Sequence, residues 1–216
     1  MRDLDNQIAY WDRVGPSKTF SHQVNVERLR RLLSAESRIL DYGCGYGRIL
    51  GVLQGEGFSN LAGFDPAPAM LAAARRDYPA IAFHDLENPP ALPLEGGSAD
   101  AVLLFSVLTC VPTDAGQIEL IGEMNRVLRS GGLLYISDFW LQADDRNLER
   151  YARGLERYGL YGVFDLPEGV TLRHHDRRWI EALTGELEQV ALDEVEVTTM
   201  NGHSARGFQW FGRKLA

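Results

Sequence analysis

Short apolar runs alternate along this chain with segments in which apolar side chains recur at every third or fourth position. A run of the first kind predicts a buried strand, and a recurrence of the second kind predicts a helix. Strands and helices predicted in this way within the first 140 residues are 39–41, 61–65, 66–78, 100–105, 118–129 and 133–139. Their alternation predicts an α/β fold, with a parallel sheet that is covered by helices on both faces.

The pattern changes towards the end of the chain. Asp176 fits the N-cap of a helix over 177–187. Segments 190–200 and 207–214 then have the composition of strands, and Asn201-Gly202-His203 between them is a turn-rich sequence. Two strands joined in this way form an antiparallel hairpin, so the sequence predicts that such a pair follows the parallel sheet.

The first predicted strand leads directly into glycines at every second position, in the sequence Ile39-Leu40-Asp41-Tyr42-Gly43-Cys44-Gly45-Tyr46-Gly47. Because glycine has no Cβ, such a loop lets the backbone approach a flat ligand closely. In the dinucleotide-binding fingerprint a third glycine follows three residues after the second, and that position is Arg48 here. A lone glycine pair would also fit an ordinary tight turn between a strand and a helix.

This loop resembles the first motif of class I S-adenosylmethionine-dependent methyltransferases, which is a hydrophobic strand, an acid and then Gly-x-Gly-x-Gly. The resemblance continues through acids that end the next two strands and through Arg126-Val127-Leu128-Arg129-Ser130-Gly131-Gly132, and it covers roughly residues 36–140. It implies a doubly wound, mostly parallel seven-stranded sheet with a C-terminal antiparallel hairpin. It also implies S-adenosylmethionine as the cofactor and S-adenosylhomocysteine as the product.

The resemblance further implies which residues contact this cofactor. Asp41 and the glycine loop would lie along its methionine part, Asp65 would accept the ribose hydroxyls, and Asp85 would meet the adenine amino group. Asp65 also fits the N-cap of a helix that begins at Pro66, and the two roles are compatible. The expected cofactor-binding residues are Tyr10, Asp41, Gly43, Cys44, Gly45, Gly47, Asp65, Pro66, Met70, Asp85, Leu86, Phe105 and Ser106.

Charge and cysteine content narrow the function further. The 216 residues include 22 Lys and Arg against 30 Asp and Glu, which gives a net charge of −8. Nucleic-acid binding depends on neutralising phosphates, so this balance favours a small-molecule substrate over RNA or DNA. Two cysteines, Cys44 and Cys110, provide neither a disulfide framework nor a metal-ligand set. With no signal-peptide pattern and no apolar run of membrane-spanning length, we expect a cytoplasmic enzyme without a metal; the oligomeric state is left open.

We expect one domain over 1–216, in which a helical flap (1–35) and a lid (141–175) flank the cofactor-binding core (36–140). The lid should consist of a helix and a loop, and 176–216 should supply the last helix and the strand pair. Aromatic side chains in the flap and lid are candidates for substrate contacts, although those of the flap would equally suit packing of the first helix on the sheet. The candidates are Trp11, Phe20, Phe139, Trp140, Tyr158 and Tyr161.

Few side chains are available as a general base, which methyl transfer requires when the acceptor must lose a proton. The candidates are His175, His174 and His22, and each would equally suit a structural histidine that is hydrogen-bonded near a helix start. Cys110 stands where many members of the family carry a histidine after the fourth strand. We expect it to be a small buried side chain rather than a nucleophile.

Taken together, the motifs predict S-adenosylmethionine-dependent methyl transfer to a small-molecule acceptor, at oxygen or nitrogen. An RNA or protein methyltransferase is one alternative, and it would need a basic or peptide-binding groove. A relative of the same fold that binds the cofactor without transferring a methyl group is the other, because the motifs encode binding rather than turnover.

Overall fold

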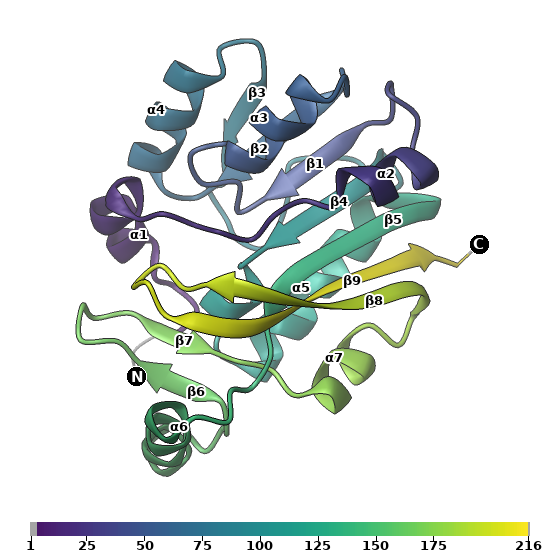
Figure 1. The fold of residues 1–216 in the computed structure, drawn as a ribbon. Coiled ribbons are helices and arrows are strands. Elements are labelled where there is room, and N and C mark those ends of the chain that lie inside the picture. The colour runs from purple at the N-terminus through teal and green to yellow at the C-terminus, as the bar shows by residue number, and fades with distance from the viewer. Residues whose placement is uncertain (1–3, 216) are drawn as a thin grey trace.

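Seven strands form one sheet in the order β3-β2-β1-β4-β5-β9-β8 (Figure 1). Strands β1 to β5 are parallel, whereas β9 is antiparallel to both β5 and β8. The structure is a computed structural model that describes residues 4–215. Its strands in this sheet are β1 (Ile39–Tyr42), β2 (Leu61–Asp65), β3 (Ala82–Asp85), β4 (Ala99–Phe105), β5 (Leu128–Phe139), β8 (Leu187–Thr198) and β9 (Ser204–Lys214). The predicted mostly parallel sheet with a C-terminal antiparallel pair is confirmed.

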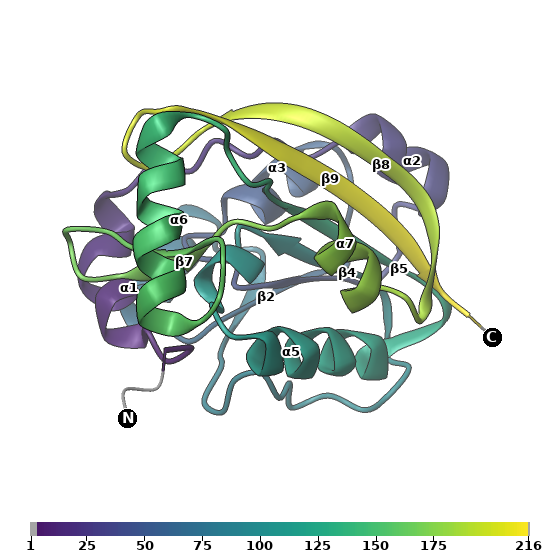
Figure 2. The same cartoon turned by 90° about the horizontal axis from the view of Figure 1, so that it is seen from below.

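Helices cover both faces of this sheet, as the view from below shows (Figure 2). Helices α5 and α7 lie against one face, and α2, α3 and α4 lie against the other. The helices of the described residues are α1 (Ile8–Val14), α2 (Val26–Leu32), α3 (Arg48–Gly55), α4 (Pro68–Asp77), α5 (Asp114–Val127), α6 (Asp145–Tyr158) and α7 (Arg177–Leu183), with short 3-10 turns η1 (Gly15–Ser17) and η2 (Leu108–Cys110).

The apolar composition of the central strands follows from burial on both faces. In β4, Val102 and Leu104 belong to the core that packs on α5, whereas Ala101 and Leu103 belong to the core on the side of α3. All four side chains are fully buried. Because successive side chains of a strand point to opposite faces, a strand with no solvent-facing side reads as a continuous apolar run.

The N-terminal segment and the lid meet at the carboxyl edge of the sheet. Helix α1 packs beside α4, where the Asp12 carboxylate accepts a hydrogen bond from the Ala69 amide at 2.7 Å. The lid is α6 followed by an antiparallel pair, β6 (Val163–Asp165) and β7 (Thr171–Arg173). A loop was expected after this helix, and a hairpin is found.

Close packing explains how so short a hairpin is held on α6. At Gly154 in the middle of the helix, a Cβ would lie 1.7 Å from the carbonyl oxygen of Val163, so the strand backbone rests directly on the helix. Tyr151, one turn earlier, is fully buried under the same hairpin with Phe164. Glycine in a helix costs stability, and here it permits this contact.

The starts of two predicted helices differ from the structure. Helix α4 begins at Pro68 with Ala67 as its N-cap, so Asp65 is not the cap; its carboxylate instead accepts from the Ala67 amide. Helix α5 begins at Asp114, where Thr113 caps it, earlier than the predicted start at 118. Its apolar periodicity is weak in the first turn, so the cap is the better signal.

The end of α5 and that of α7 also fall earlier than predicted. Helix α5 ends at Val127, and β5 already begins at Leu128 and passes through Ser130-Gly131-Gly132 with a shift of register. Helix α7 begins after Asp176 as predicted but ends at Leu183, because Leu187 is already the first residue of β8. In both places an apolar residue of the predicted helix, Leu128 or Leu187, belongs to the following strand. An apolar side chain suits either kind of element.

Candidate active site

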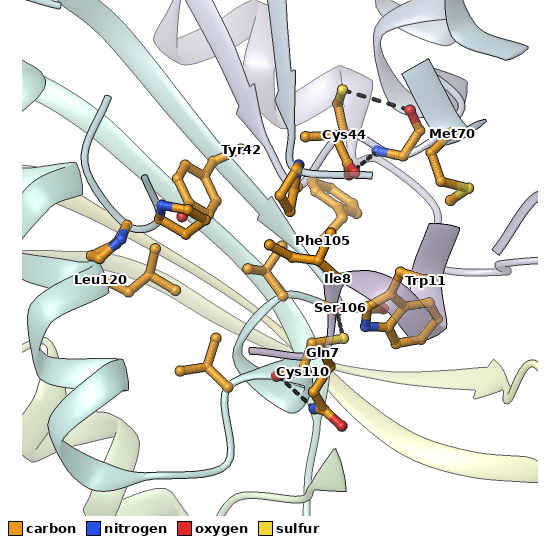
Figure 3. Close-up of a pocket in the computed structure, with 18 of the residues that line it drawn as sticks. Gln7, Ile8, Trp11, Tyr42, Cys44, Met70, Phe105, Ser106, Cys110 and Leu120 are labelled. Carbon is orange, nitrogen blue, oxygen red and sulfur yellow. Dashed lines mark hydrogen bonds between the residues drawn. The ribbon is translucent and has the colours of Figure 1, made fainter. Parts of the chain in front are cut away.

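A cavity of about 380 Å³ opens between the carboxyl ends of β1 and β4. The order of the strands reverses between these two neighbours, and in open α/β sheets ligands bind at such a switch point. We call it the first cavity. Its lining includes Asp41 in β1, Gly43 and Gly45 after β1, Asp65 at the end of β2 and Phe105 at the end of β4. Figure 3 shows side chains of the N-terminal segment, including Ile8 and Trp11, opposite Met70 and Cys44.

Asp41 is the unusual group of this cavity. Its side chain is buried, and neither carboxylate oxygen has a hydrogen-bond partner within the described part of the chain. Burial raises the pKa of Asp41 to about 8, the nearby Arg48 guanidinium opposes this shift, and Asp65 adds to it. A buried polar group without partners costs free energy, and such groups concentrate where a ligand supplies the missing partner.

The glycine loop is pinned by Asp65. One carboxylate oxygen of Asp65 accepts from the Gly45 amide and the other accepts from the Ala67 amide, both at 2.8 Å. Gly45 has a φ of +54°, and a Cβ there would come within 2.8 Å of Cε of Met70. Each carboxylate oxygen keeps a further lone pair that can accept from a ligand. Burial raises the pKa of Asp65 to about 6, opposed by these two hydrogen bonds.

Not all of the expected cofactor-binding residues line the first cavity. Asp85 pairs with Arg75 at 2.7 Å on the surface, and Leu86 is buried in the core. Gly47 caps α3 with a φ of +80°, where a Cβ would meet the ring of Phe83. The expected residues on the lining are Asp41, Gly43, Cys44, Gly45, Asp65, Pro66, Met70, Phe105 and Ser106; those off it are Tyr10, Gly47, Asp85 and Leu86.

A second cavity of about 370 Å³ lies beside the first. It is enclosed by the flap, the lid and the turn between β8 and β9, and its lining includes Phe139, Arg150, Phe164, His174 and Met200. The two cavities share four lining residues, and these form a common wall. The shared residues are Trp11, Phe20, Ser106 and Cys110.

The common wall is held in a strained backbone conformation. Ser106 has a φ of 57°, which is rare for a residue other than glycine, and its amide donates to the carbonyl of Ser137 at 2.8 Å. The Cys110 thiol donates to the carbonyl of Ser106 at 3.2 Å, and burial raises its pKa well above the ordinary value. Such strain costs roughly 1–3 kcal/mol and is concentrated at functional sites. A thiol of this kind is a packing group rather than a nucleophile.

The three candidate bases divide between two environments. His22 and His174 line the second cavity, whereas His175 lines neither cavity. His175 is buried with Nδ1 3.3 Å from the carbonyl of Phe139 and Nε2 2.9 Å from Nε2 of Gln117. Burial lowers the pKa of both His22 and His175 to about 3. The expectation that His175 reaches an acceptor is therefore corrected, because its ring belongs to the core contact between β5 and α5.

The candidate aromatic residues divide in the same way. Trp11 and Phe20 line both cavities, and Phe139 lines the second. Trp140 is buried and stacks on Phe208 with ring centroids 4.1 Å apart, so it is a core residue. Outside both cavities are also Tyr158, whose hydroxyl donates to the Asp165 carboxylate, and the exposed Tyr161.

Several lining residues carry no sequence signal of their own. Gln7 is buried and joins three elements: its amide nitrogen donates to the carbonyls of Cys110 and Thr171, and its oxygen accepts from the Thr171 amide. Pro89 and Pro90, before β4, and Leu120 of α5 also line the first cavity. Their positions depend on how distant segments pack, which no local pattern encodes. Within residues 4–215, no group of three metal-ligating side chains comes together.

The sheet order and a glycine-lined cavity at the switch point define an α/β protein of the nucleotide-cofactor-binding kind. A family profile described as "Methyltransferase domain" matches residues 40–136. A ubiquinone biosynthesis O-methyltransferase of Xylella fastidiosa is 29% identical over 152 residues, which is 62% of this chain and 58% of the relative. A ubiquinone/menaquinone biosynthesis C-methyltransferase of Campylobacter jejuni is 27% identical over 150 residues, or 63% and 62%.

The fold has a clear counterpart among solved structures. An S-adenosylmethionine-dependent methyltransferase from Methanosarcina mazei superposes with a TM-score of 0.82 at 24% identity, covering 89% of this chain and 98% of that one. The match to the curated relatives spans less than two thirds of their length. Residues 40–136 thus match the methyltransferase domain family, and the chain has the fold of a solved S-adenosylmethionine-dependent methyltransferase. S-adenosylmethionine is the cofactor that this family and fold imply.

The first cavity fits this cofactor on two observations of its own. The buried Asp41 carboxyl lacks a partner in the described residues, and the cofactor carries an ammonium group that can provide one. Gly43 and Gly45 present bare backbone to this cavity at positive φ, and a Cβ at either position would collide with Val107 or Met70 of the same lining. Anionic acceptors and bare backbone are what a cation with a flat nucleoside part requires.

Replacing Asp65 tests the pinning of the loop together with the ribose assignment. We expect Asp65→Ala to weaken S-adenosylmethionine binding about thirtyfold, the scale of lost charge-assisted hydrogen bonds. It should also lower the free energy of unfolding by about 1–3 kcal/mol, because the amides of Gly45 and Ala67 lose their acceptor. Calorimetry and thermal denaturation measure the two effects, and Asp65→Asn, which keeps one acceptor oxygen, should fall between. Unchanged affinity in the alanine variant would contradict the ribose assignment.

Proposed function

We propose that this chain transfers a methyl group from S-adenosylmethionine, bound in the first cavity, to a small-molecule acceptor in the second cavity, at oxygen or nitrogen. One observation carries the proposal: the two cavities are neighbours that share the wall formed by Trp11, Phe20, Ser106 and Cys110. Because these four residues line both cavities, the cavities adjoin there, and a methyl donor in the first and an acceptor in the second would meet at this junction.

The residues of the first cavity would orient the cofactor. Asp41 would pair with its ammonium group, Asp65 would accept its ribose hydroxyls, and the loop from Gly43 to Gly45 would lie along its methionine part. The bound cofactor supplies a methyl group on a positively charged sulfur. Because the loop backbone is fixed by the hydrogen bond from Gly45 to Asp65, the cofactor would be held in one position relative to the common wall.

Rate enhancement would come mainly from positioning and from the exclusion of water. Well-oriented intramolecular reactions gain on the order of 7–11 kcal/mol from proximity. Trp11 and Phe20 present aromatic surface to both cavities and belong to the flap, which would close the site. A dry site favours a reaction in which charge is lost, since water stabilises the charged ground state.

The names of the relatives support a small organic acceptor, since the two curated proteins are named for ubiquinone or menaquinone biosynthesis, one as an O- and one as a C-methyltransferase. The net charge of −8 points the same way, against a nucleic-acid acceptor. Both cysteines are free thiols, which suits a reducing compartment such as the cytoplasm. No helix within residues 4–215 has the length and apolar character needed to cross a membrane.

The experiment is a titration followed by a transfer assay. The purified chain is titrated with S-adenosylmethionine and S-adenosylhomocysteine by calorimetry, and the methyl-labelled cofactor is then offered with pools of phenols, amines, carboxylates and thiols. Binding together with label in one pool supports the proposal and names the nucleophile. Binding without transfer to any pool would favour a macromolecular acceptor or a fold relative of different chemistry, and absence of binding would overturn the proposal.

A further inference from the structure

Two arginines of the lid line the second cavity, one turn apart on α6. The guanidinium of Arg150 lies 4.4 Å from the centroid of the Phe164 ring, on its face, and no carboxylate of the described residues lies within ion-pair distance of it. Arg146 lies 3.7 Å from an oxygen of the exposed Asp144. Burial and the neighbouring Arg146 both lower the pKa of Arg150, so its charge is poorly compensated. An anionic ligand would relieve this imbalance.

The other titratable side chains of the lining do not neutralise the positive charge of Arg150. Glu168 is the one acidic side chain on the described lining, and it pairs with Lys18 at 3.4 Å. His22 and His174 are neutral, because burial holds the pKa of each far below the ordinary value. The second cavity therefore has an excess of positive charge although the chain as a whole has a net charge of −8.

His174 is arranged as a hydrogen-bond donor. The hydroxyl oxygen of Tyr151 accepts from the Gln142 amide at 3.1 Å and lies 2.6 Å from Nδ1 of His174. Because Nδ1 of His174 is the only acceptor among the hydrogen-bond partners of this hydroxyl within residues 4–215, the tyrosine proton is assigned to the bond with Nδ1. A neutral imidazole that accepts at Nδ1 carries its proton on Nε2. His174 thus offers an N–H to the cavity that it lines, and not the lone pair of a base.

Aromatic rings form the remaining walls. Phe139 contacts two imidazoles, with centroid distances of 4.6 Å to His22 and 5.2 Å to His174. Phe164 contacts His174 edge to face, and the guanidinium of Arg150 lies over its ring. A flat ring can stack between such groups while a charged substituent reaches the guanidinium.

We propose that the second cavity selects small aromatic acceptors that carry an oxyanion, with Arg150 and Arg146 as counter-ions and Nε2–H of His174 as a further donor. This inference rests on the proposed function in so far as the ligand is the methyl acceptor. The recognition itself requires no cofactor, because none of these three side chains lines the first cavity. Binding can therefore be measured separately from methyl transfer.

The test compares charged and neutral probes of the same shape. Benzoate, 4-hydroxybenzoate and salicylate are titrated against benzamide, 4-hydroxybenzamide and salicylamide, with the full chain free or saturated with S-adenosylhomocysteine. We expect at least one acid to bind at least about tenfold more tightly than its amide, in both forms of the protein. Equal affinity for acids and amides, or no binding of any acid, would overturn the inference.

Matched variants assign the effect to the lid. Arg150→Gln should lower the affinity for the best acid at least about tenfold and leave the affinity for the matching amide unchanged. Arg153→Gln is the control, because Arg153 is on the same helix, lies off the cavity lining and pairs with Glu149 at 3.6 Å in solvent. Equal acid affinity in the two variants would show that Arg150 is not the counter-ion. S-adenosylmethionine titration is done in parallel, so loss of cofactor binding would count against the proposed function alone.

Discussion

Asp41→Asn is expected to abolish most of the affinity for S-adenosylmethionine, by at least about a hundredfold. Removing one partner of a buried charge pair costs about 2–5 kcal/mol, and Asp41 is buried with no other partner in the described residues. The variant changes the shape of the side chain little, so the loop should keep its conformation. Calorimetric titration of both proteins at one pH measures the difference. Equal affinities would show that Asp41 does not contact the cofactor.

The affinity for S-adenosylmethionine should depend on pH in the wild-type chain but not in Asp41→Asn. A cofactor ammonium binds the ionised form of Asp41, whose pKa in the free protein is about 8. Affinity of the wild-type chain should therefore rise between pH 6.5 and 7.5, with uptake of the cation coupled to proton release. The window lies above the pKa of Asp65, near 6. In Asp41→Asn the weak residual affinity should be flat across it, and a matching slope in the variant would contradict the assignment.

Stability should change in the opposite direction to binding. Burial raises the pKa of Asp41 in the folded state to about 8, above the ordinary carboxyl value of the unfolded chain. Below that ordinary value Asp41 is protonated in both states, and the fold has its full stability. As the pH rises from there to about 8, only the unfolded chain gains from ionisation, so the free energy of unfolding falls. The loss accrues at roughly 1.4 kcal/mol per pH unit over that range. Asparagine has no proton to lose, so Asp41→Asn should melt at a higher temperature, by a margin that widens from pH 5 to 7.5. A constant margin would mean that Asp41 does not titrate on unfolding.

These opposed effects explain why an unpartnered carboxyl stands in the core of the switch point. At neutral pH the raised pKa of Asp41 should make the wild-type fold less stable than a variant with a neutral side chain at position 41. A ligand that brings its own positive charge recovers that free energy on binding. Binding sites often lower the stability of a fold in this way, because a polar group that must contact a ligand cannot also be paired within the protein.

The sheet could be predicted from sequence because its signals are local. Strands such as β4 are buried on both sides and read as apolar runs, and the glycines after β1 have φ values that other residues rarely adopt. Asp41 and Asp65 both line the first cavity, because each lies at or next to the carboxyl end of a strand of the parallel sheet. The carboxyl ends of neighbouring parallel strands meet at one edge, whatever the rest of the chain does.

The acceptor side could not be predicted in the same way. The second cavity joins Phe20, Phe139, His174 and Met200, which are far apart in sequence and meet through the packing of the flap and lid. His174 and His175 are adjacent and directly follow β7, yet His174 lines the second cavity and His175 is buried in the core. From the sequence, Arg150 would be taken for a solvent-exposed helix residue. Its environment depends on the hairpin β6–β7, which places the ring of Phe164 against its guanidinium.

Asp85 shows how a motif can match while its geometry differs. The acid after β3 stands at the expected position in sequence, but its side chain pairs with Arg75 of α4 and is 57% exposed. The first cavity is bounded there by Pro89 and Pro90 instead. A sequence motif fixes where the backbone of a residue lies, whereas a competing partner on the next helix decides where its side chain points.

Gly45→Val is expected to remove cofactor binding, again by at least about a hundredfold, for a steric reason. Gly45 lines the first cavity with a φ of +54°, and a Cβ there already lies 2.8 Å from Cε of Met70. The valine methyl groups would extend from this Cβ at the cavity wall, where the cofactor must approach the backbone. The left-handed conformation adds about 1–2 kcal/mol of strain, which lowers the stability of the fold without explaining lost affinity.

Gly57→Val separates strain from steric exclusion. Gly57 also has a positive φ, of +89°, and nothing lies within 4 Å of a Cβ there, in the turn that follows α3 and away from both cavities. Both variants should melt at lower temperatures than the wild type, but Gly57→Val should bind S-adenosylmethionine normally. If both lost binding equally, loop strain rather than contact would be the cause. If Gly45→Val bound normally, the glycine loop would not touch the cofactor.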